Sequence, residues 1–367
     1  MHERDTVRIG IVGLGGIARH HADQFAALAD EGVPVTLAGG MDIDADAREA
    51  FGDDYDVRTF GDADALYETV DAVVVTTPNC FHEEYVVSAL DAGLDVLVEK
   101  PLAHTVESAE RIAASARTAD GFCMVGFHNR FAPEVRALKA RVDDGRLGDL
   151  YHVDASYVRR RGVPGRGSWF TDADAAGGGA LIDIGAHAID LALHLMDFPE
   201  VVEVAGTTRS TFGGREEYTY LEMWGEDGSG EFTVDDSAHA LLRCADGQTI
   251  ALETSWAANR PPETAYVVEG TEAGAALDRT EESLTIYGVD DVGGPQFTDT
   301  TVTTDGDPAH RTEGRRFVEA VAAGDPPGTN TVAEALAVQR VVAAIYESAA
   351  TGGAVDLADG LAAEADD

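Results

Sequence analysis

The chain has 367 residues, 44 % of them hydrophobic, which is enough for two domains that each bury a core. Acidic residues outnumber basic ones by 67 to 26, and the formal net charge is −41. A surface this negative repels nucleic acid and anionic lipid, so we expect neither nucleic acid nor a membrane as a partner.

The N-terminal third of the chain alternates short apolar runs with helical patterns. This alternation predicts a doubly wound parallel sheet built from βαβ units, which we assign to a first domain at 1–126. The expected strands are Val7–Val12, Val35–Gly39, Ala72–Thr77, Val96–Glu99 and Cys123–Phe127, and the expected helices are Ile17–Asp30, His82–Ala92 and Val106–Ala119.

After Leu150 the pattern changes to strand-like runs separated by turn residues, around one apolar helix expected over Gly177–Met196. These runs predict a mainly antiparallel sheet in a second domain, 127–367, with two closing helices within 311–350 that pack back. The expected strands are Tyr151–Arg160, Val201–Ser210, Tyr218–Trp224, Ala238–Cys244, Thr249–Trp256, Ala265–Glu269 and Leu284–Tyr287, with hairpin turns at 226–230 and 245–247.

A glycine-rich turn follows the first expected strand and opens the first expected helix. It reads Gly13-Leu-Gly15-Gly16-Ile17-Ala18. The first glycine permits a tight turn, the second permits close approach to a pyrophosphate, and the small Ala18 lets the helix pack on the strand. Helix N–H groups then face the anion. Between a strand and a helix, this G-x-G-x-x-A motif predicts a dinucleotide site on a Rossmann domain.

Asp42 lies at the end of the second expected strand. A carboxylate there accepts hydrogen bonds from ribose hydroxyls and repels a 2′-phosphate, which predicts NAD in preference to NADP. A turn aspartate in the acidic stretch Asp42–Asp46 is the other interpretation, with Asp44 the next candidate for the cofactor role.

The run Val98-Glu99-Lys100-Pro101 ends the fourth expected strand with a charged pair and a proline. The carboxyl ends of parallel strands face the ligand crevice. An ion pair at the surface is the simpler interpretation. We favour a functional Lys100, because the only other lysine in the chain is Lys139.

The apolar helix carries one polar stripe. Asp183 and His187 are four residues apart and share a helix face, which Asp190 and His194 continue. A helix that is apolar apart from one such stripe is predicted to be buried, and buried ionisable groups often mark an active site. Carboxylate–histidine pairs that only satisfy one another are an alternative. A metal site is another, but hydride chemistry needs no metal and we expect none.

Four arginines lie in the eight-residue segment Arg159–Arg166. They either neutralise acidic neighbours or place one or two guanidinium groups, Arg159 among them, on substrate hydroxyls or an anionic substrate group. The sequence leaves both interpretations open.

Cys80, Cys123 and Cys244 form no C-x-x-C pair, so neither a disulfide framework nor a zinc knuckle is predicted. The first residues lead directly into an apolar run at Val7 without the basic segment of a signal peptide. No apolar run approaches the roughly 18 residues of a membrane span. We therefore expect a cytoplasmic protein. Its acid-rich, lysine-poor composition is similar to that of proteins from salt-accumulating halophiles.

Taken together and in this order, the motifs resemble the glucose-fructose oxidoreductase, inositol dehydrogenase and rhizopine-catabolism (Gfo/Idh/MocA) family. The resembling segments are GLGGIA at Gly13–Ala18, TTPNCFH at Thr76–His82, VEKP at Val98–Pro101, GGGALIDIGAHAID at Gly177–Asp190, and the C-terminal stretch Glu313–Ser348. They extend over nearly the whole chain.

The resemblance implies an α/β protein: a Rossmann domain followed by an α/β domain whose large, open, mainly antiparallel sheet packs homodimers or homotetramers. It implies that Lys100, Asp183 and His187 line the reacting carbon, with His187 as the base, Asp183 as its orienting partner and Lys100 on the hydroxyl oxygen. It also places near the cofactor, besides the glycine loop and Asp42, a further set of residues: Thr76, Pro78, Asn79, His82, Glu99, Lys100 and Trp169.

The chemistry of these residues agrees with alcohol oxidation. A histidine with an ordinary pKa near 6.5 suits a general base, and a lysine ammonium stabilises a developing alkoxide. We therefore expect an NAD-dependent dehydrogenase that oxidises a hydroxyl of a sugar, a sugar derivative or a cyclic polyol. The alternatives are a redox-assisted glycosidase that uses bound NAD transiently, and a regulator that binds NAD without turnover.

Overall fold

The computed structural model describes residues 6–215, 217 and 230–357, and these form two compact units. Unit 1 comprises Met1–Phe131 and Asp307–Gln339, and unit 2 comprises Ala132–Gly306 and Arg340–Asp367.

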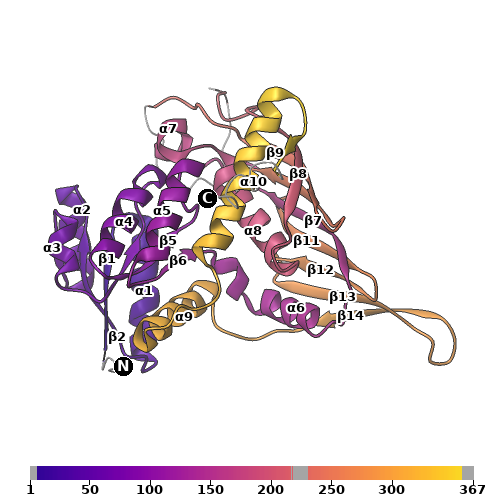
Figure 1. The fold of residues 1–367 in the computed structure, drawn as a ribbon, viewed down its shortest axis with the longest axis horizontal. Helices are drawn as coiled ribbons and strands as arrows, with labels where there is room; N and C mark the ends of the chain where they lie inside the picture. The colour runs from indigo at the N-terminus through magenta and orange to yellow at the C-terminus, as the bar shows by residue number, and fades with distance from the viewer. Residues whose placement is uncertain (1–5, 216, 218–229, 358–367) are drawn as a thin grey trace. The chain divides into compact units, whose positions relative to one another are not determined.

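Unit 1 is built on a six-stranded parallel sheet with the order β3-β2-β1-β4-β5-β6 (Figure 1). The strands are β1 (Val7–Val12), β2 (Val35–Met41), β3 (Arg58–Phe60), β4 (Ala72–Val75), β5 (Asp95–Glu99) and β6 (Cys123–Gly126). The helices are α1 (Gly16–Asp30), α2 (Ala45–Tyr55), α3 (Ala63–Tyr67), α4 (His82–Asp91), α5 (Val106–Thr118) and α9 (Ala309–Ala323), with short 3-10 turns at Asn79–Phe81 and His128–Phe131.

The core of unit 1 explains why these segments form strands. Ile9, Ile11 and Val74 are fully buried, as expected for a parallel sheet with both faces covered. Phe317 and Val321 of α9 pack in the same cluster as Ile9 and Ile11. This packing places α9 in unit 1, whose first segment extends to Phe131.

The strand order of unit 1 reverses between β1 and β4. Chain connections leave the sheet in opposite directions from these two strands, which opens a crevice at their carboxyl ends. The glycine loop follows β1, and Thr76 follows β4. The topology therefore places both motifs at the point where ligands bind in such sheets.

Unit 2 contains a nine-stranded sheet with the order β14-β13-β12-β11-β7-β10-β9-β8-β15. The pairing is antiparallel except between β7 and β10, which run parallel, so the sheet is mixed rather than purely antiparallel. The strands are β7 (Leu150–Val158), β8 (Val201–Arg209), β9 (Ser237–Cys244), β10 (Thr249–Ser255), β11 (Glu263–Gly270), β12 (Gly274–Asp278), β13 (Ser283–Asp290), β14 (Gln296–Val302) and β15 (Val355–Asp356).

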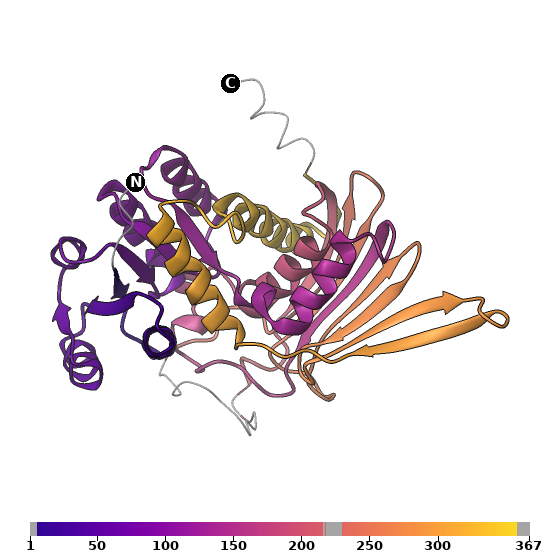
Figure 2. The same ribbon diagram turned by 90° about the horizontal axis from the view of Figure 1, so that it is seen from below.

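Helices α6 (Pro133–Asp143) and α8 (Ala186–Leu195) lie on one face of this sheet, as does the second half of α10, a helix that spans Val332–Thr351 (Figure 2). The short helix α7 (Ala173–Ala176) also belongs to unit 2. The stretch Ala173–Leu195 is apolar enough for a membrane span by length and composition, but 94 % of its window is buried in the protein. It is the core helix of unit 2.

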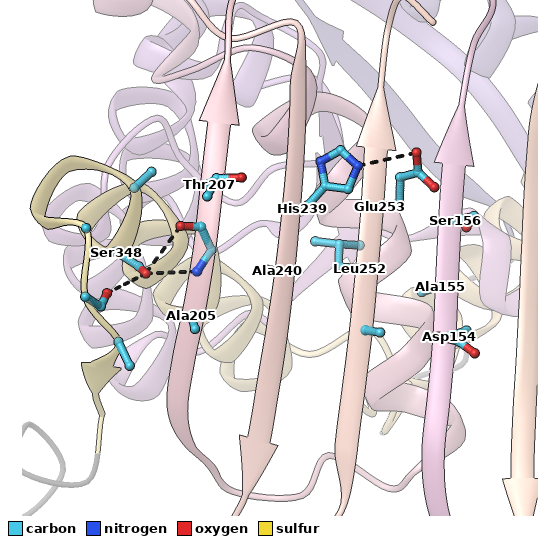
Figure 3. Close-up of a pocket in the computed structure, with 16 residues that line it drawn as sticks. Asp154, Ala155, Ser156, Ala205, Thr207, His239, Ala240, Leu252, Glu253 and Ser348 are labelled. Atoms are coloured by element: carbon cyan, nitrogen blue, oxygen red, sulfur yellow. Dashed lines mark hydrogen bonds and ion pairs between the residues drawn. The ribbon is translucent and has the colours of Figure 1, made fainter. Parts of the chain in front are cut away.

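The opposite face of the sheet is not covered by any helix of the described residues, and Figure 3 looks onto it. A hollow of about 670 Å³ lies over β7 to β10 beside the end of α10. His239 and Glu253 point toward one another across this face, with 3.4 Å between Nε2 and Oε1. Further out, the hairpin of β13 and β14 extends beyond the rest of the sheet (Figure 2).

Several elements have weak sequence signals and were not expected: α2, α3, α6, β3, β12, β14 and β15. Helix α2 buries only Phe51, so it has no apolar stripe to reveal it. Strand β14 reads Gln-Phe-Thr-Asp-Thr-Thr-Val and is largely exposed. The expected strand Tyr218–Trp224 and most of the expected turn at 226–230 lie outside the described residues.

Candidate active site

The glycine loop of unit 1 has the geometry of a pyrophosphate cradle. Gly13 has φ +89°, and a Cβ there would lie 2.9 Å from the Thr77 backbone nitrogen, so only glycine fits. A Cβ at Gly15 or Gly16 would meet nothing within 4 Å, so a ligand can approach this backbone closely. Helix α1 begins at Gly16 with no side-chain cap and no acidic residue in its first turn. Its N-terminus is therefore suited to an anion.

Asp42 is fixed beside this loop. Its Oδ2 accepts the Leu14 backbone N–H at 2.8 Å, and its Oδ1 accepts the Asp44 backbone N–H at 2.9 Å. The side chain is thus held at the end of β2 against the glycine turn, where a ribose hydroxyl can reach its remaining lone pairs. Asp44 caps helix α2 by accepting the Asp46 N–H at 2.9 Å, so the alternative candidate has a structural role.

Thr76 and His82 support the loops at the strand ends. The Thr76 hydroxyl donates to the Gly13 carbonyl at 2.6 Å and lies 3.1 Å from the Val12 carbonyl. The fully buried His82 ring lies 2.9 Å from the Pro101 carbonyl and 3.0 Å from the Thr77 carbonyl. Burial lowers the pKa of His82, so the neutral ring can donate to only one of them. Both side chains therefore fix the backbone of these loops. Asn79 is also buried.

Each carboxylate oxygen of Glu99 contacts a neighbour within unit 1. Its Oε1 lies 2.8 Å from His21 Nε2, and its Oε2 accepts the Lys100 backbone N–H at 3.2 Å. Burial alone would raise the pKa of Glu99, but the hydrogen bond and charge of His21 outweigh it, with contributions from Lys100 and His310, and lower the pKa to about 2. A permanent carboxylate therefore lies next to Lys100, which is half-buried at the end of β5.

A cluster of imidazole rings surrounds this carboxylate. His310 of α9 stacks on His128 with 3.6 Å between ring centroids and contacts His20 of α1 edge-on at 4.4 Å. Burial lowers the pKa of His310 to about 4 and also lowers that of His20. Neither histidine was expected here, because the two segments are far apart in the sequence.

The polar stripe of unit 2 lies on a buried helix, as expected, but the helix is not uniform. Leu181–Gly185 forms one π-helical turn before α8 begins at Ala186. Asp183 lies in the π turn and His187 in the first turn of α8, and each is 6 % exposed. Such π turns are frequent at functional sites.

Two side chains from the sheet contact Asp183. The indole Nε1 of Trp256 donates to Asp183 Oδ2 at 2.8 Å, and Arg159 Nη1 lies 3.8 Å from the same oxygen. Arg159 follows β7, and its backbone N–H donates to the Ser255 carbonyl at 2.7 Å. Arg159 is thus a neighbour of Asp183.

The start of the π turn is fixed by a second buried carboxylate. Asp235 accepts the backbone N–H groups of Gly179 at 2.8 Å and Leu181 at 3.0 Å, and the Tyr346 hydroxyl at 2.7 Å. A Cβ at Gly179 would lie 1.8 Å from the Asp235 carbonyl oxygen, so this close approach requires glycine. Burial raises the pKa of Asp235.

The other arginines of the 159–166 segment make contacts with neutral groups. Arg161 Nη2 donates to Asn259 Oδ1 at 2.8 Å, and Arg166 Nη1 donates to the Arg215 carbonyl at 2.8 Å. Arg161 and Arg215 both lie over the Phe212 ring. Arg160 is exposed.

The structure groups the predicted site residues within each unit. The glycine loop, Asp42, Thr76, Pro78, Asn79, His82, Glu99 and Lys100 belong to unit 1; Arg159, Trp169, Asp183 and His187 belong to unit 2. Trp169 stacks on Phe170 with 3.8 Å between ring centroids. The sequence reasoning missed Trp256, for which the only signal was a tryptophan at the end of a predicted strand.

Comparison with known proteins agrees with this division. Residues 7–127 match the model of an oxidoreductase family with an NAD-binding Rossmann fold, and residues 135–276 match the GFO/IDH/MocA C-terminal domain. The D-glucoside 3-dehydrogenase of Escherichia coli strain K12 is 32 % identical over 96 % of this chain and 97 % of its own length. A D-xylose 1-dehydrogenase (NADP(+)) of Haloferax volcanii is 29 % identical over 95 % and 99 %.

The fold also matches a solved structure. An oxidoreductase domain protein from Kribbella flavida superposes with a TM-score of 0.84 at 28 % identity, over 96 % of this chain and 100 % of the other. The chain therefore belongs to the Gfo/Idh/MocA family of oxidoreductases with an NAD(H)-binding Rossmann domain, and it is a dehydrogenase that acts on a hydroxyl of a sugar, a sugar derivative or a polyol.

Proposed function

We propose that His187 is the general base of this dehydrogenase, that Asp183 orients its ring, and that Lys100 holds the substrate hydroxyl. The observation that supports this most is the pair of ionisable side chains, each 6 % exposed, on a helix that is apolar apart from the stripe that Asp190 and His194 continue. Burying such groups is costly unless they are partnered or used, so their presence favours a catalytic role.

Each side chain contributes one part of the reaction. His187 takes the hydroxyl proton, and positioned proton transfer is worth about 10²–10⁴-fold in rate. The Lys100 ammonium stabilises the developing alkoxide, while Glu99 beside it keeps the local charge balanced. When bound, the nicotinamide supplies the hydride acceptor. The open backbone at Gly15 and Gly16, the start of α1 and Asp42 would hold the cofactor.

We infer that NAD is preferred over NADP. Support comes from Asp42, whose carboxylate is fixed against the glycine turn by two backbone N–H groups. A ribose 2′-phosphate beside this anion would meet like-charge repulsion. The NADP-dependent relative from Haloferax volcanii shows that homologues differ in this choice, so the cofactor preference depends on the residues of each chain.

A neutral glucoside is the first substrate to test, because a relative that spans the full length is a D-glucoside 3-dehydrogenase. The decisive assay is NADH formation from NAD over glucosides, aldoses, inositols, deoxysugars, anhydrosugars and sugar acids. Turnover of at least one of these classes supports the proposal. NAD binding with no turnover of any of them would favour the regulator instead.

We propose that the open sheet face of unit 2 packs against a second copy of the chain, as a homodimer or a homotetramer. By strand register, five apolar side chains share this face: Leu241, Val267, Tyr287, Val289 and Phe297, which are 51, 41, 45, 72 and 91 % exposed. An exposed apolar stripe of this size marks an interaction surface. Replacement of Leu241 and Phe297 by Asp should yield monomers in size-exclusion chromatography with light scattering.

We further propose a cytoplasmic, salt-adapted protein without nucleic-acid or membrane partners. The net charge of −41 repels itself strongly unless salt shortens the Debye length, which is about 3 Å at 1 M and about 30 Å at 0.01 M. The free energy of unfolding should therefore rise from low salt to molar KCl. Equal stability in both would contradict the salt adaptation.

A further inference from the structure

The end of β10 is tied to the π turn that carries Asp183. Trp256, directly after β10, donates its indole N–H to Asp183 Oδ2 at 2.8 Å. Two residues earlier, the Thr254 hydroxyl lies 3.4 Å from the Ala180 carbonyl. A Cβ at Gly185 would come within 3.3 Å of Thr254 Cγ2, so the helix backbone lies close against the strand.

Trp256 is a rigid donor. Its side chain is fully buried, in a cluster with Ala180, Ile184 and Val234. Its backbone N–H donates to the Asp236 carbonyl at 2.9 Å, and its carbonyl accepts the Gly162 N–H at 2.8 Å. The indole therefore has one position available to it, and the direction of its N–H bond is set by the sheet.

The contact has the features of an orienting hydrogen bond. A carboxylate that is 6 % exposed requires donors to remain ionised, and a hydrogen bond to an ion is about twice as strong as a neutral one. Arg159 Nη1 lies 3.8 Å from the same oxygen, farther than the indole Nε1 of Trp256 at 2.8 Å. Because the indole is neutral, it fixes the direction of the carboxylate without cancelling its charge.

We propose that Trp256 is a positioning residue of the reaction: its indole N–H holds Asp183 in the orientation that sets the His187 ring for proton transfer. The inference rests on the proposed roles of Asp183 and His187. It adds a residue from the sheet that acts only through Asp183, not on the substrate or the cofactor.

The first test is Trp256→Phe, which keeps an aromatic ring and removes the donor. We expect kcat to fall about ten- to a hundredfold, the effect of losing one hydrogen bond to a charged group, with little change in KM or in the Kd for NAD. Tyr266→Phe is the matched control. It also removes a polar atom from a fully buried aromatic side chain of the same sheet, and it should leave kcat unchanged.

A double-mutant cycle separates positioning from a general loss of packing. In the Asp183→Ala background, Trp256→Phe should lower kcat by less than about twofold, because the oxygen that accepts the indole N–H is already gone. An undiminished effect there, or wild-type kcat in Trp256→Phe alone, overturns the inference. Wild-type kcat in Asp183→Ala alone would instead contradict the proposed orienting role of Asp183.

A spectroscopic test does not depend on how Trp256→Phe folds. The chain has three tryptophans, so its indole N–H region contains three signals by NMR, and the other two can be assigned by Trp169→Phe and Trp224→Phe. The Trp256 signal should be shifted downfield and protected from exchange, and both properties should be lost in Asp183→Ala, which has no acceptor. A Trp256 signal that is the same in both proteins would contradict the hydrogen bond.

Discussion

The two units hold their candidate functional groups in different ways. Unit 1 presents them at strand ends, where side chains such as Thr76 and Asp42 mainly fix backbone and the glycine turn leaves open space over Gly15 and Gly16. Unit 2 carries Asp183 and His187 on a helix buried in its core and fixes Asp183 with an indole from the sheet. The first arrangement suits binding of a cofactor, and the second suits proton transfer away from water.

This difference predicts which property of the enzyme a variant in each unit should change. Changes in unit 1, apart from Lys100, should act mainly on cofactor choice and on stability. Changes along the buried helix of unit 2 should act mainly on kcat. Lys100 is the exception, because it belongs to unit 1 but has a proposed role in catalysis.

The largest effects are expected at His187 and Lys100. His187→Ala and Lys100→Met should each lower kcat by at least about a hundredfold, since one removes the base and the other the charge on the developing alkoxide. NAD binding, followed by fluorescence titration, should survive. Lys100→Arg should also be poor, because a planar guanidinium does not replace a compact ammonium. Near-normal kcat in Lys100→Met would contradict the proposed role of Lys100 in catalysis.

The imidazole cluster of unit 1 predicts loss of stability in mild acid. The pKa of His310 is about 4 when folded, against about 6.5 when unfolded, so the unfolded chain binds more protons between these values. The free energy of unfolding should therefore fall as the pH drops from about 6.5 to 4, by at most about 3 kcal/mol from this residue. The neighbouring Glu99 keeps its charge in the folded protein across that window, because its pKa there is about 2.

Denaturant unfolding over this pH range measures the effect. His310→Phe keeps a ring against His128 and His20 and should make the free energy of unfolding less dependent on pH. The control is His239→Phe on the open face of unit 2, which should leave the slope unchanged. A slope that persists in His310→Phe would assign the acid sensitivity elsewhere.

A smaller effect is expected at Asp42. Asp42→Ser removes the repulsion of a 2′-phosphate and should reduce the ratio of kcat/KM for NAD over NADP by about tenfold or more. Steady-state assays with both cofactors and one substrate measure this ratio. A wild-type enzyme that uses NADP as well as NAD would contradict the role of Asp42.

Sequence reasoning was most successful where function depends on backbone conformation. The glycine turn is visible because only glycine adopts φ +89° at Gly13, and the strands of unit 1 are visible because both faces of the sheet are buried. The spacing of Asp183 and His187 correctly indicated a buried helix. The π turn, however, depends on Asp235 and Tyr346, which lie far away in the sequence.

The contacts made between distant segments had no local signal. Trp256 meets Asp183 only because β10 packs beside the π turn, and His310 meets His20 only because α9 packs in the core of unit 1. The parallel pairing of β7 with β10 is likewise set by the order of the whole sheet. Such pairs are determined by tertiary packing rather than by any pattern within one segment.

The central claim, direct hydride transfer from a sugar carbon, is tested most directly by isotope transfer. The best substrate of the NADH screen is prepared with deuterium on the carbon that carries the reacting hydroxyl and incubated with NAD. Direct transfer should give one deuterated NADH and one oxidised sugar, a ketone or a lactone, per turnover, and at least about a hundredfold less of both with His187→Ala. Release of free sugar from a glycoside with no net NADH, or deuterium lost to water, would contradict it.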